Sequence, residues 1–564
     1  MKNTVRLTNF CGRLCVALCL LILVVQPVFA FNDPPTRVAR LNYVQGDVSF
    51  QPGGESDWGW AAVNRPMTTG DSLWTGDSSR AELHVGSTAL RVGPQTSVSF
   101  LNLDDRTMQT QLNSGTIDLR VRNLYGNVIE VDTPNIAFTA LRPGDYRITV
   151  DPNGDFTTIT LRAGQGRVDG GGQAFLVDGG SQVQISGTDY ISYDVYDLPS
   201  RDNFDQWSYT RGLREDRSRS ARYVSPELTG YEDLDQNGTW RVDRNYGPVW
   251  TPTHVSQDWA PYQQGHWAWV DPWGWTWVDD AASGFVTSHY GRWTYINNGY
   301  NSGNSGQNNG GYNNGGYNSG SGNGGYNNGS GNYNNGSNNG YWAWVPPRRS
   351  ASRGGYSQPP VYSPALVSFV GDSNSWQNFG NGGGVAWFPL APGEVYVPAY
   401  QTSPAYITRV NVSNTAVQQP AITSAVNFIN NQVANNQANN QANNQANNQA
   451  ANRPAANPPA VVYANQKVAG AVTAVPRATF VNAQPVAPAA VKVTVSAVAA
   501  APVVRAAPVA PVKASVMGAS AGSASAAQAA TAPAAGARAS NAPAPAAPAP
   551  AASAPAVHTA AAPP

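Results

Sequence analysis

Cysteine is almost absent from this chain. Only three of its 564 residues are cysteine, and all three (Cys11, Cys15 and Cys19) lie near the N-terminus. A disulfide framework, a cysteine nucleophile and a Cys-ligated metal are therefore excluded for everything beyond residue 30.

Charge is also scarce, and neither sign dominates. Charged residues make up 12% of the chain, and 35 basic residues balance 35 acidic ones. Proteins that neutralise nucleic-acid phosphates carry a clear basic excess, so we expect no nucleic-acid partner. Residues 401–564 contain no acidic residue at all, which separates an acidic front from a mildly basic tail.

Catalytic motifs are missing as well. The five histidines form no HExxH pair, and the chain has neither a GxSxG elbow nor a GxxxxGK[ST] loop. A glycosidase needs two carboxylates at a set separation. Four carboxylates lie near the aromatic segments: Asp271, Asp279, Asp280 and Glu394. Asp271 is explained as a turn residue, and Asp279 and Asp280 as residues at the end of a strand, so only Glu394 has no such explanation. We expect no enzyme activity, no cofactor and no metal site.

The N-terminus has the order of a secretory signal peptide. Lys2, Arg6 and Arg13 precede an apolar run over 15–25, and small residues lead up to Ala30. This pattern predicts residues 1–30 as a signal peptide that is cleaved after Ala30, and therefore a periplasmic or secreted protein. No later stretch approaches the roughly 18 apolar residues of a membrane span, so we expect no transmembrane segment after cleavage.

Residues 37–189 alternate in the manner of strands with one buried face. The segments Ala81–Val85 and Thr96–Phe100 are clear examples, and Asp151–Gly154 has the composition of a tight turn between two strands. Repeated short strands over this length predict an all-β sandwich or rolled sheet. His84 lies in mid-strand with no second histidine nearby, so we interpret it as a packed or surface residue rather than a metal ligand.

This region resembles the FecR-type domain of bacterial envelope proteins. The resemblance depends on Gly70–Phe100, preceded by Gly46-Asp47-Val48 and followed by Leu112–Ile117. It implies a periplasmic β-domain used for protein interaction, best known in regulators that pass an outer-membrane signal to a sigma-factor system. This chain is expected to begin with a signal peptide where such regulators carry a cytoplasmic region, and we expect no counterpart of their membrane helix.

Residues 199–226 form a charged connector. Phe204, Trp207 and Leu213 fall at near-helical offsets and predict a helix over 201–219, capped by Ser200 or Asp202. Five arginines alternate with Glu215 and Asp216, which favours a solvated helix face over a phosphate site; these arginines are Arg211, Arg214, Arg217, Arg219 and Arg222.

Tryptophan is abundant in the region that follows. Nine tryptophans lie between Trp240 and Trp293, and two runs alternate at period two around a turn at 271–274, which predicts a hairpin with a shared aromatic face. Two interpretations remain open: these indoles are the core of small hairpin repeats, or they form a platform that binds a flat ligand such as a sugar. The candidate ligand-binding residues are Trp267, Trp269, Trp275, Trp277, Trp293, Trp342 and Trp344.

Residues 190–485 resemble an uncharacterised Trp- and Tyr-rich domain of exported, proline-rich bacterial proteins, which brings no known activity. We expect its β repeats over 227–420, a disordered Gly/Asn insert at 297–340 and a return segment at 461–485. The tyrosines of the insert are typical of self-associating segments, although a simple loop insertion is the preferred interpretation. The Asn/Gln/Ala repeat at 430–450 is expected to be a spacer, and residues 486–564 a disordered Ala/Pro tail.

Together these features predict a mainly β, exported, non-catalytic envelope protein with a FecR-like sandwich, a short helix, a Trp-rich hairpin domain and long disordered segments. Its expected partner is an envelope protein or a cell-wall or extracellular glycan. Two alternatives stay open: an accessory component of FecR-like envelope signalling, and a carbohydrate-active enzyme that holds glycan on the Trp-rich face.

Overall fold

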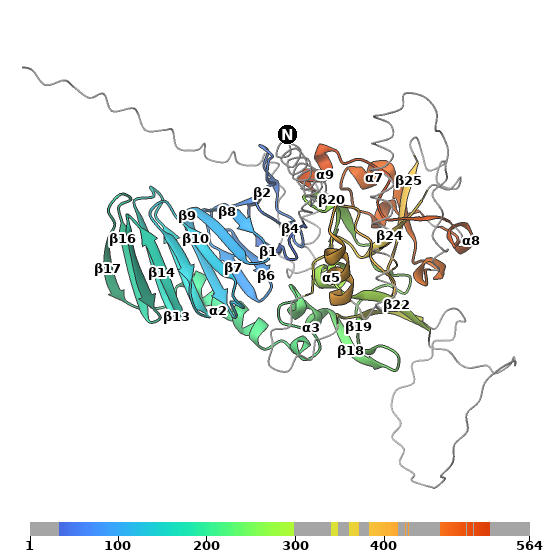
Figure 1. Ribbon diagram of the computed structural model, residues 1–564, viewed down its shortest axis with the longest axis horizontal. Helices are drawn as coiled ribbons and strands as arrows, with labels where there is room; N and C mark the ends of the chain where they lie inside the picture. Colours follow the sequence, from blue (N-terminus) through green and yellow to red (C-terminus); the bar gives the residue numbers. More distant parts are fainter. Residues whose placement is uncertain are drawn as a thin grey trace, which may run out of the picture.

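The computed structural model describes two β-rich bodies joined by a helical connector (Figure 1). The mainly β fold class predicted from the sequence is confirmed, and the helices among the described residues are short. The residues described are 33–297, 340–347, 360–371, 383–414, 424, 427, 463–491, 493–499 and 501–518.

The first body is a two-layer sandwich whose layers share one apolar core. Strand β9 belongs to both layers, because it pairs with β7 and β12 in one and with β8 and β10 in the other. One layer runs β4 (Pro66–Met67), β1 (Ala39–Gln45), β6 (Arg80–Val85), β7 (Thr88–Val92), β9 (Thr107–Val121), β12 (Gly144–Val150), β13 (Phe156–Ala163), β16 (Ser181–Ser186) and β17 (Ser192–Asp197). The other runs β3 (Gly59–Trp60), β2 (Val48–Gln51), β5 (Ser72–Thr75), β8 (Thr96–Leu103), β9, β10 (Val128–Asp132), β11 (Ala137–Ala140), β14 (Gln165–Gly170) and β15 (Gln173–Asp178).

Strand β9 can serve both layers because it has a glycine at its centre. Gly115 has a φ of +90°, and a Cβ there would lie 2.3 Å from Oγ1 of Thr96. Only glycine accepts this backbone geometry without strain. The hairpin predicted at Asp151–Gly154 is also present, since β12 and β13 pair on either side of it and Gly154 N–H donates to the Asp151 carbonyl at 3.0 Å.

The predicted connector helix is α2, which spans Asn203–Asp216. Its N-cap is Asp202, one of the two caps predicted, and the Asp202 carboxylate accepts a hydrogen bond from the backbone N–H of Asp205 at 2.8 Å. Short turns lead from α2 into the second body: η1 (Ser220–Arg222), η2 (Tyr231–Asp233) and α3 (Leu234–Asn237).

The second body has three small sheets around one aromatic core. The first sheet runs β18 (Gly238–Asp243), β19 (Gly247–Pro252), β23 (Gly340–Val345) and β22 (Arg292–Asn297); the second is the hairpin β20 (Gly265–Val270) and β21 (Gly274–Asp279); the third runs β26 (Thr473–Pro476), β25 (Gly384–Pro389), β24 (Val367–Val370) and β27 (Val503–Val504). The helices are α4 (Gly284–His289), α5 (Pro404–Asn414), η3 (Asn465–Lys467), α7 (Arg477–Val481), η4 (Ala487–Ala489), α8 (Val495–Val498) and α9 (Lys513–Met517).

Strands β22 and β23 enclose the Gly/Asn-rich insert. Asn297 at the end of β22 pairs directly with Gly340 at the start of β23. The chain therefore leaves and re-enters the sheet at one point, which agrees with an insertion into a hairpin loop.

The predicted start of the disordered tail at residue 486 is wrong. Residues 486–491, 493–499 and 501–518 contribute to the second body, with Val486 and Val498 buried and β27 paired with β24. The prediction failed because the segment consists mainly of alanine, valine and proline, which is the composition of a spacer. We call residues 503–518 the C-terminal strap.

Several sequence predictions lie outside the described residues: the signal peptide at 1–30, the interior of the insert at 297–340, the repeat at 430–450, and the tail beyond 518. Within the described part of the chain, no helix combines the length and the apolarity that crossing a membrane requires.

Candidate functional site

Four tryptophans form a continuous cross-strand row in the second body. Trp240 pairs with Trp250, Trp250 with Trp344, and Trp344 with Trp293, so the row crosses all four strands of one sheet. Three of these side chains are at most 3% exposed, and Trp240 is partly buried. The row is therefore part of the aromatic core.

A second tryptophan cluster is centred on the predicted hairpin. Trp267 pairs with Trp277 and Trp269 pairs with Trp275, as the period-two pattern predicted. The Trp267 ring lies 5.3 Å from the Trp387 ring at an interplanar angle of 82°, and 5.2 Å from the Phe480 ring. The Trp267–Trp387 contact is edge to face, and aromatic pairs of this kind contribute about 0.5–1.5 kcal/mol each beyond burial.

Of the seven candidate ligand-binding tryptophans, five are buried: Trp267, Trp277, Trp293, Trp342 and Trp344. Their placement favours the core interpretation that the sequence left open. Trp269 and Trp275 are half-buried, so ligand binding by these two remains a prediction. The indole N–H of Trp275 donates to the Val509 carbonyl of the strap at 3.0 Å, and that of Trp269 donates to Asp271 at 3.0 Å.

The carboxylates considered for glycosidase chemistry have structural partners. Asp279 accepts hydrogen bonds from the indole of Trp277 and the backbone of Ala281, both at 2.9 Å, and burial raises its pKa to about 7. Glu394 accepts from the backbone N–H groups of Ala391 and Ala464, each at 2.7 Å.

Among the described residues, a dense cluster of titratable groups lies where the sandwich meets the connector and the second body. At its centre is His84 of β6, which is 3% exposed. Its Nε2 lies 3.1 Å from Oε1 of Glu82 and 3.5 Å from Oε1 of Glu215, and its Nδ1 lies 3.0 Å from Oε1 of Glu232. One histidine thus joins a sandwich strand, the connector helix and the second body. We call His84, its three glutamates and their partners Arg91 and Arg211 the junction cluster.

Arginines neutralise the carboxylates of the junction cluster. Arg91 donates through Nε to Glu82 at 2.7 Å and through Nη2 to Glu215 at 2.9 Å. Arg211 of α2 adds a bidentate contact to Glu82, with both bonds at 2.7 Å. The solvated helix face predicted for the connector is therefore wrong at Arg211 and Glu215, because these side chains turn toward the sandwich.

The same junction continues through Arg40 of β1. Its Nη1 lies 2.7 Å from Oδ2 of Asp233, and its Nη2 donates to the carbonyl of Ala282 at 2.7 Å. Beside it, the side-chain amide of Asn64 donates to the carbonyls of Asp279 and Ala281 at 2.8 and 2.7 Å. The two bodies are thus joined by buried, directional contacts.

The junction cluster shifts the ionisation of its members strongly. Burial opposes the charged imidazolium of His84, but Glu215, Glu232 and Glu82 outweigh it and hold the pKa of His84 well above its usual value. Burial likewise opposes ionisation of Glu232, yet His84 and Arg40 lower its pKa to about 2. The pKa of Glu82 is also well below its usual value, because Arg91, His84 and Arg211 outweigh its burial.

Glu82, His84 and Glu215 have the residue types and spacing of a metal site, with ligand atoms within 4.8 Å of one another. Their charges are already matched, however, because Arg91 bridges both carboxylates. A divalent cation would have to displace this guanidinium. The donor set therefore fits an ion-paired cluster better than a metal.

Comparison with known proteins adds a family for one part of the chain. Residues 231–307 match a family of unknown function, DUF6600. No curated protein matches. Two solved structures of a "putative anti-sigma factor" from Parabacteroides distasonis show 13% and 12% identity, each with a TM-score of 0.21 and covering 22% of this chain. The chain spans 60% of the length of those structures.

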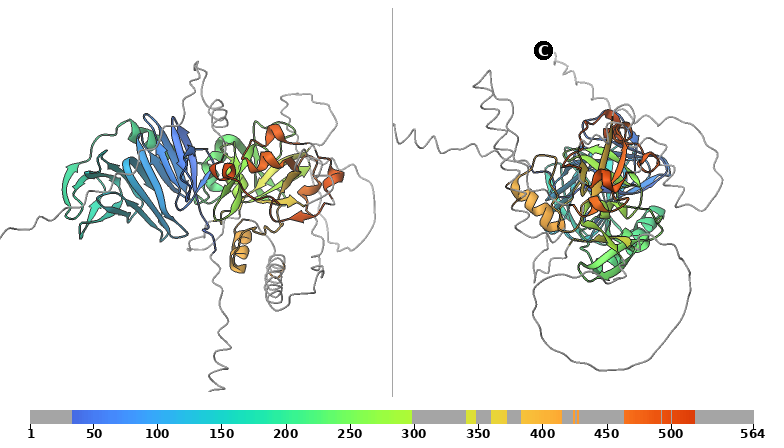
Figure 2. Two further views of the ribbon diagram at one scale, coloured as in Figure 1. Left: turned by 90° about the horizontal axis from the view of Figure 1, so that it is seen from above. Right: turned by 90° about the vertical axis from the view of Figure 1, so that its right-hand side faces the viewer.

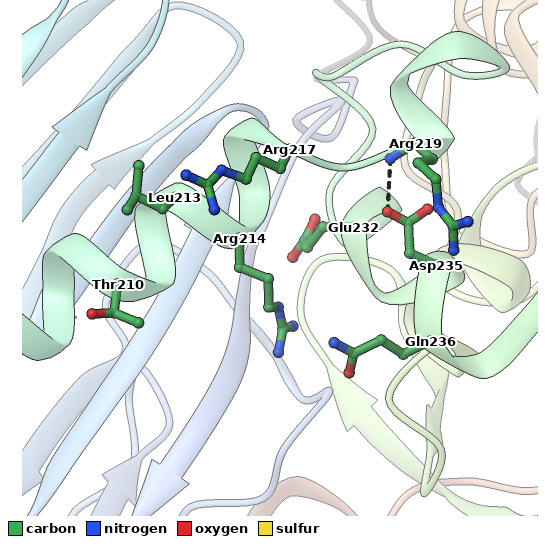
Figure 3. A pocket seen from close by; sticks show the side chains of 8 residues that line it. All are labelled: Thr210, Leu213, Arg214, Arg217, Arg219, Glu232, Asp235 and Gln236. Carbon is green, nitrogen blue, oxygen red and sulfur yellow. Dashed lines mark hydrogen bonds between the residues drawn. The ribbon is translucent and has the colours of Figure 1, made fainter.

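A pocket of ≈ 470 Å³ lies beside the junction cluster, between the end of α2 and α3 (Figure 3). Arg214 and Arg217 line one side of it and Asp235 and Gln236 the other, with Glu232 between them. Arg214 is paired with Asp233 at 2.9 Å, and Asp235 accepts from the backbone N–H of Arg219 at 2.7 Å. Mixed charge in this pocket gives it no preference for an anion or a cation.

Proposed function

We propose that this protein is an exported, non-catalytic interaction protein of the bacterial envelope, in which a FecR-like sandwich is held rigidly on a Trp-rich domain and binds a protein partner. The observation that carries this proposal is the junction cluster. Its charged side chains are mostly buried and are paired across three elements. This dense group of ionisable side chains therefore joins two domains.

The burial of the tryptophans supports a protein partner over a glycan. A glycan platform needs indole faces open to solvent, whereas five of the seven candidates are in the core. The exposed apolar side chains lie instead mainly on the sandwich, which is the domain that resembles a partner-binding module.

Export is tested by expressing the full chain with a C-terminal tag and fractionating the cells. We expect the envelope or secreted fraction to contain a protein whose N-terminal sequence begins at Phe31. Recovery of the intact chain from the cytosol would contradict the proposal, and so would turnover of any polysaccharide in a panel by the purified mature protein.

Partner binding is tested in the same cells with a photo-crosslinking residue placed at single exposed positions of the mature chain. We expect protein adducts from positions on the sandwich, and few from an exposed position on the second body such as Val242, which is 83% exposed. Adducts confined to the second body would assign the interaction to the other domain.

A further inference from the structure

The sandwich has two unlike ends. At the end near β1 and β4, contacts such as those of Arg40 and Asn64 attach it to the second body, and Nη2 of Arg65 donates to the Val516 carbonyl of the strap at 2.7 Å. At the opposite end, β17 closes one layer (Figures 1 and 2), and β15 closes the other. Among the described strands, β17 pairs with β16 alone and β15 with β14 alone. We call the β15–β17 end the open end.

Exposed apolar side chains gather at the open end. Of the eighteen large hydrophobic side chains that are exposed in the described residues, six fall within residues 176–198. An edge strand that carries such side chains is a template for pairing with another chain. The six are Leu176, Tyr190, Tyr193, Val195, Tyr196 and Leu198, with exposures between 37% and 87%.

Strand register shows that two of these side chains extend the core. Val195 pairs with Val183 and Tyr193 pairs with Ile185, and both partners are at most 2% exposed. Paired residues point to the same face of a sheet. The core face of this layer therefore continues onto β17, where Val195 becomes 63% exposed.

The open end is also acidic. Residues 168–200 contain five aspartates and no lysine, arginine or histidine. Two of them, Asp194 and Asp197, are on β17 itself. Natural edge strands are commonly protected by charged side chains, especially lysine, or by proline; β17 has its two aspartates but neither lysine nor proline.

We propose that β17 is a docking edge that accepts an extended segment of another protein as an additional strand. The segment alternates apolar residues, which cover Tyr193 and Val195, with basic residues, which match Asp194 on the other face of β17. Backbone hydrogen bonds along β17 supply affinity, and the alternating side chains supply selectivity. This inference rests on the proposed function, because it names the surface and the partner chemistry of the same interaction.

A second copy of this chain is a poorer occupant of the edge. It would bring the same acidic, base-free segment against Asp194 and Asp197. Like charges placed together across a strand pair destabilise it. A basic segment removes this repulsion.

The test uses the full mature chain and a synthetic six-residue peptide that alternates valine and lysine, matching the six residues of β17. We expect saturable binding by fluorescence anisotropy. Val195→Lys should weaken it by about tenfold or more, because it adds like charge and removes an apolar contact. The matched control Val242→Lys, at an exposed valine of edge strand β18, should leave it unchanged.

Two further peptides separate strand addition from simple charge attraction. A peptide that alternates valine and glutamate should not bind. The Val/Lys peptide with alternate backbone nitrogens methylated keeps its charge but loses the donors of one edge, so it should bind about tenfold more weakly or worse. Equal binding of the methylated peptide, or equal loss with Val195→Lys and Val242→Lys, would overturn the proposal. The proposal would also be overturned if the protein sedimented as a dimer that Val195→Lys dissociates, because the occupant of the edge would then be a second copy.

Failure of this inference is distinguishable from failure of the proposed function. If a cellular photo-adduct forms on the sandwich and Val195→Lys does not reduce it, the protein binds a partner through another surface. If no adduct forms from any sandwich position, the proposed function itself fails.

Discussion

Nδ1 of His84 in the sandwich lies 3.0 Å from Oε1 of Glu232 in the second body. The two residues are 148 positions apart in the sequence, and both are buried. Through this contact, part of the attachment of the two bodies depends on the charge of one histidine.

Stability should depend on pH through His84. Its folded-state pKa is raised above 6.5, so its contribution is complete below about pH 6.5 and is lost as the pH rises through the raised value. For Glu232 the folded pKa of about 2 lies below 4.5, so its contribution is lost only as the pH falls below about 4.5. Urea unfolding should show a decline of up to ~1.4 kcal/mol per pH unit on the alkaline side. His84→Gln should remove that decline; an unchanged slope in this variant would contradict the assignment.

Glu82 should be among the most sensitive residues of the sandwich. Glu82→Gln leaves the buried Arg91 and His84 and the half-buried Arg211 without their common carboxylate, which should cost about 3–5 kcal/mol in the free energy of unfolding. The matched control Arg167→Ala breaks the exposed pair with Asp169 and should cost about 1 kcal/mol or less. Chemical denaturation followed by far-UV circular dichroism measures both. Similar losses of unfolding free energy in the two variants would mean that burial of the junction cluster adds little to stability.

The tryptophan interpretation is tested by comparing Trp267→Ala with Trp269→Ala. Trp267 is 1% exposed and touches several rings, so its removal should cost about 3–5 kcal/mol. Trp269 is half-buried and should cost clearly less. Affinity electrophoresis in polysaccharide gels gives the second measurement. If Trp269→Ala stays folded and abolishes retention that the wild type shows, the glycan interpretation holds for this site.

Residues 486–518, which include the C-terminal strap, should stabilise both bodies. Ending the chain after residue 485 removes the buried Val486 and Val498, worth about 1.5–3 kcal/mol each, and the acceptor of the Trp275 indole. A loss of about 3 kcal/mol or more should lower Tm by roughly 6 °C or more. Ending the chain after residue 518 should leave Tm unchanged. Equal Tm values for the two truncations would show that residues 486–518 contribute nothing to stability.

Local patterns predicted the local structure well. The alternation of tryptophans predicted the 265–279 hairpin and its shared face, Asp202 was one of two predicted helix caps, and Asp151–Gly154 was recognised as a turn. Each of these depends on residues within a few positions of one another, where period and turn chemistry are informative.

Long-range contacts explain what the sequence could not predict. The partners of His84 come from three separate elements, so an isolated mid-strand histidine looked unremarkable. The sequence predicted Arg211 and Glu215 to be solvated, because the sequence of a charged helix does not indicate which of its faces contacts buried charged residues of another domain. The packed segment 486–518 has the composition of a spacer, and its role depends on strand pairing with β24.

The tryptophans are distributed unevenly between the two bodies, so the two bodies contribute unequally to the optical signals of the protein. The sandwich holds Trp58, Trp60 and Trp74, whereas thirteen of the 17 tryptophans follow residue 239. Many of the latter lie edge to face at short range, as Trp269 and Trp275 do at 5.6 Å and 88°, so their electronic transitions couple. Near-ultraviolet dichroism and intrinsic emission will therefore mainly follow melting of the aromatic body. The sandwich contributes a smaller share of these signals, so its melting is better followed with a label or an amide-region signal.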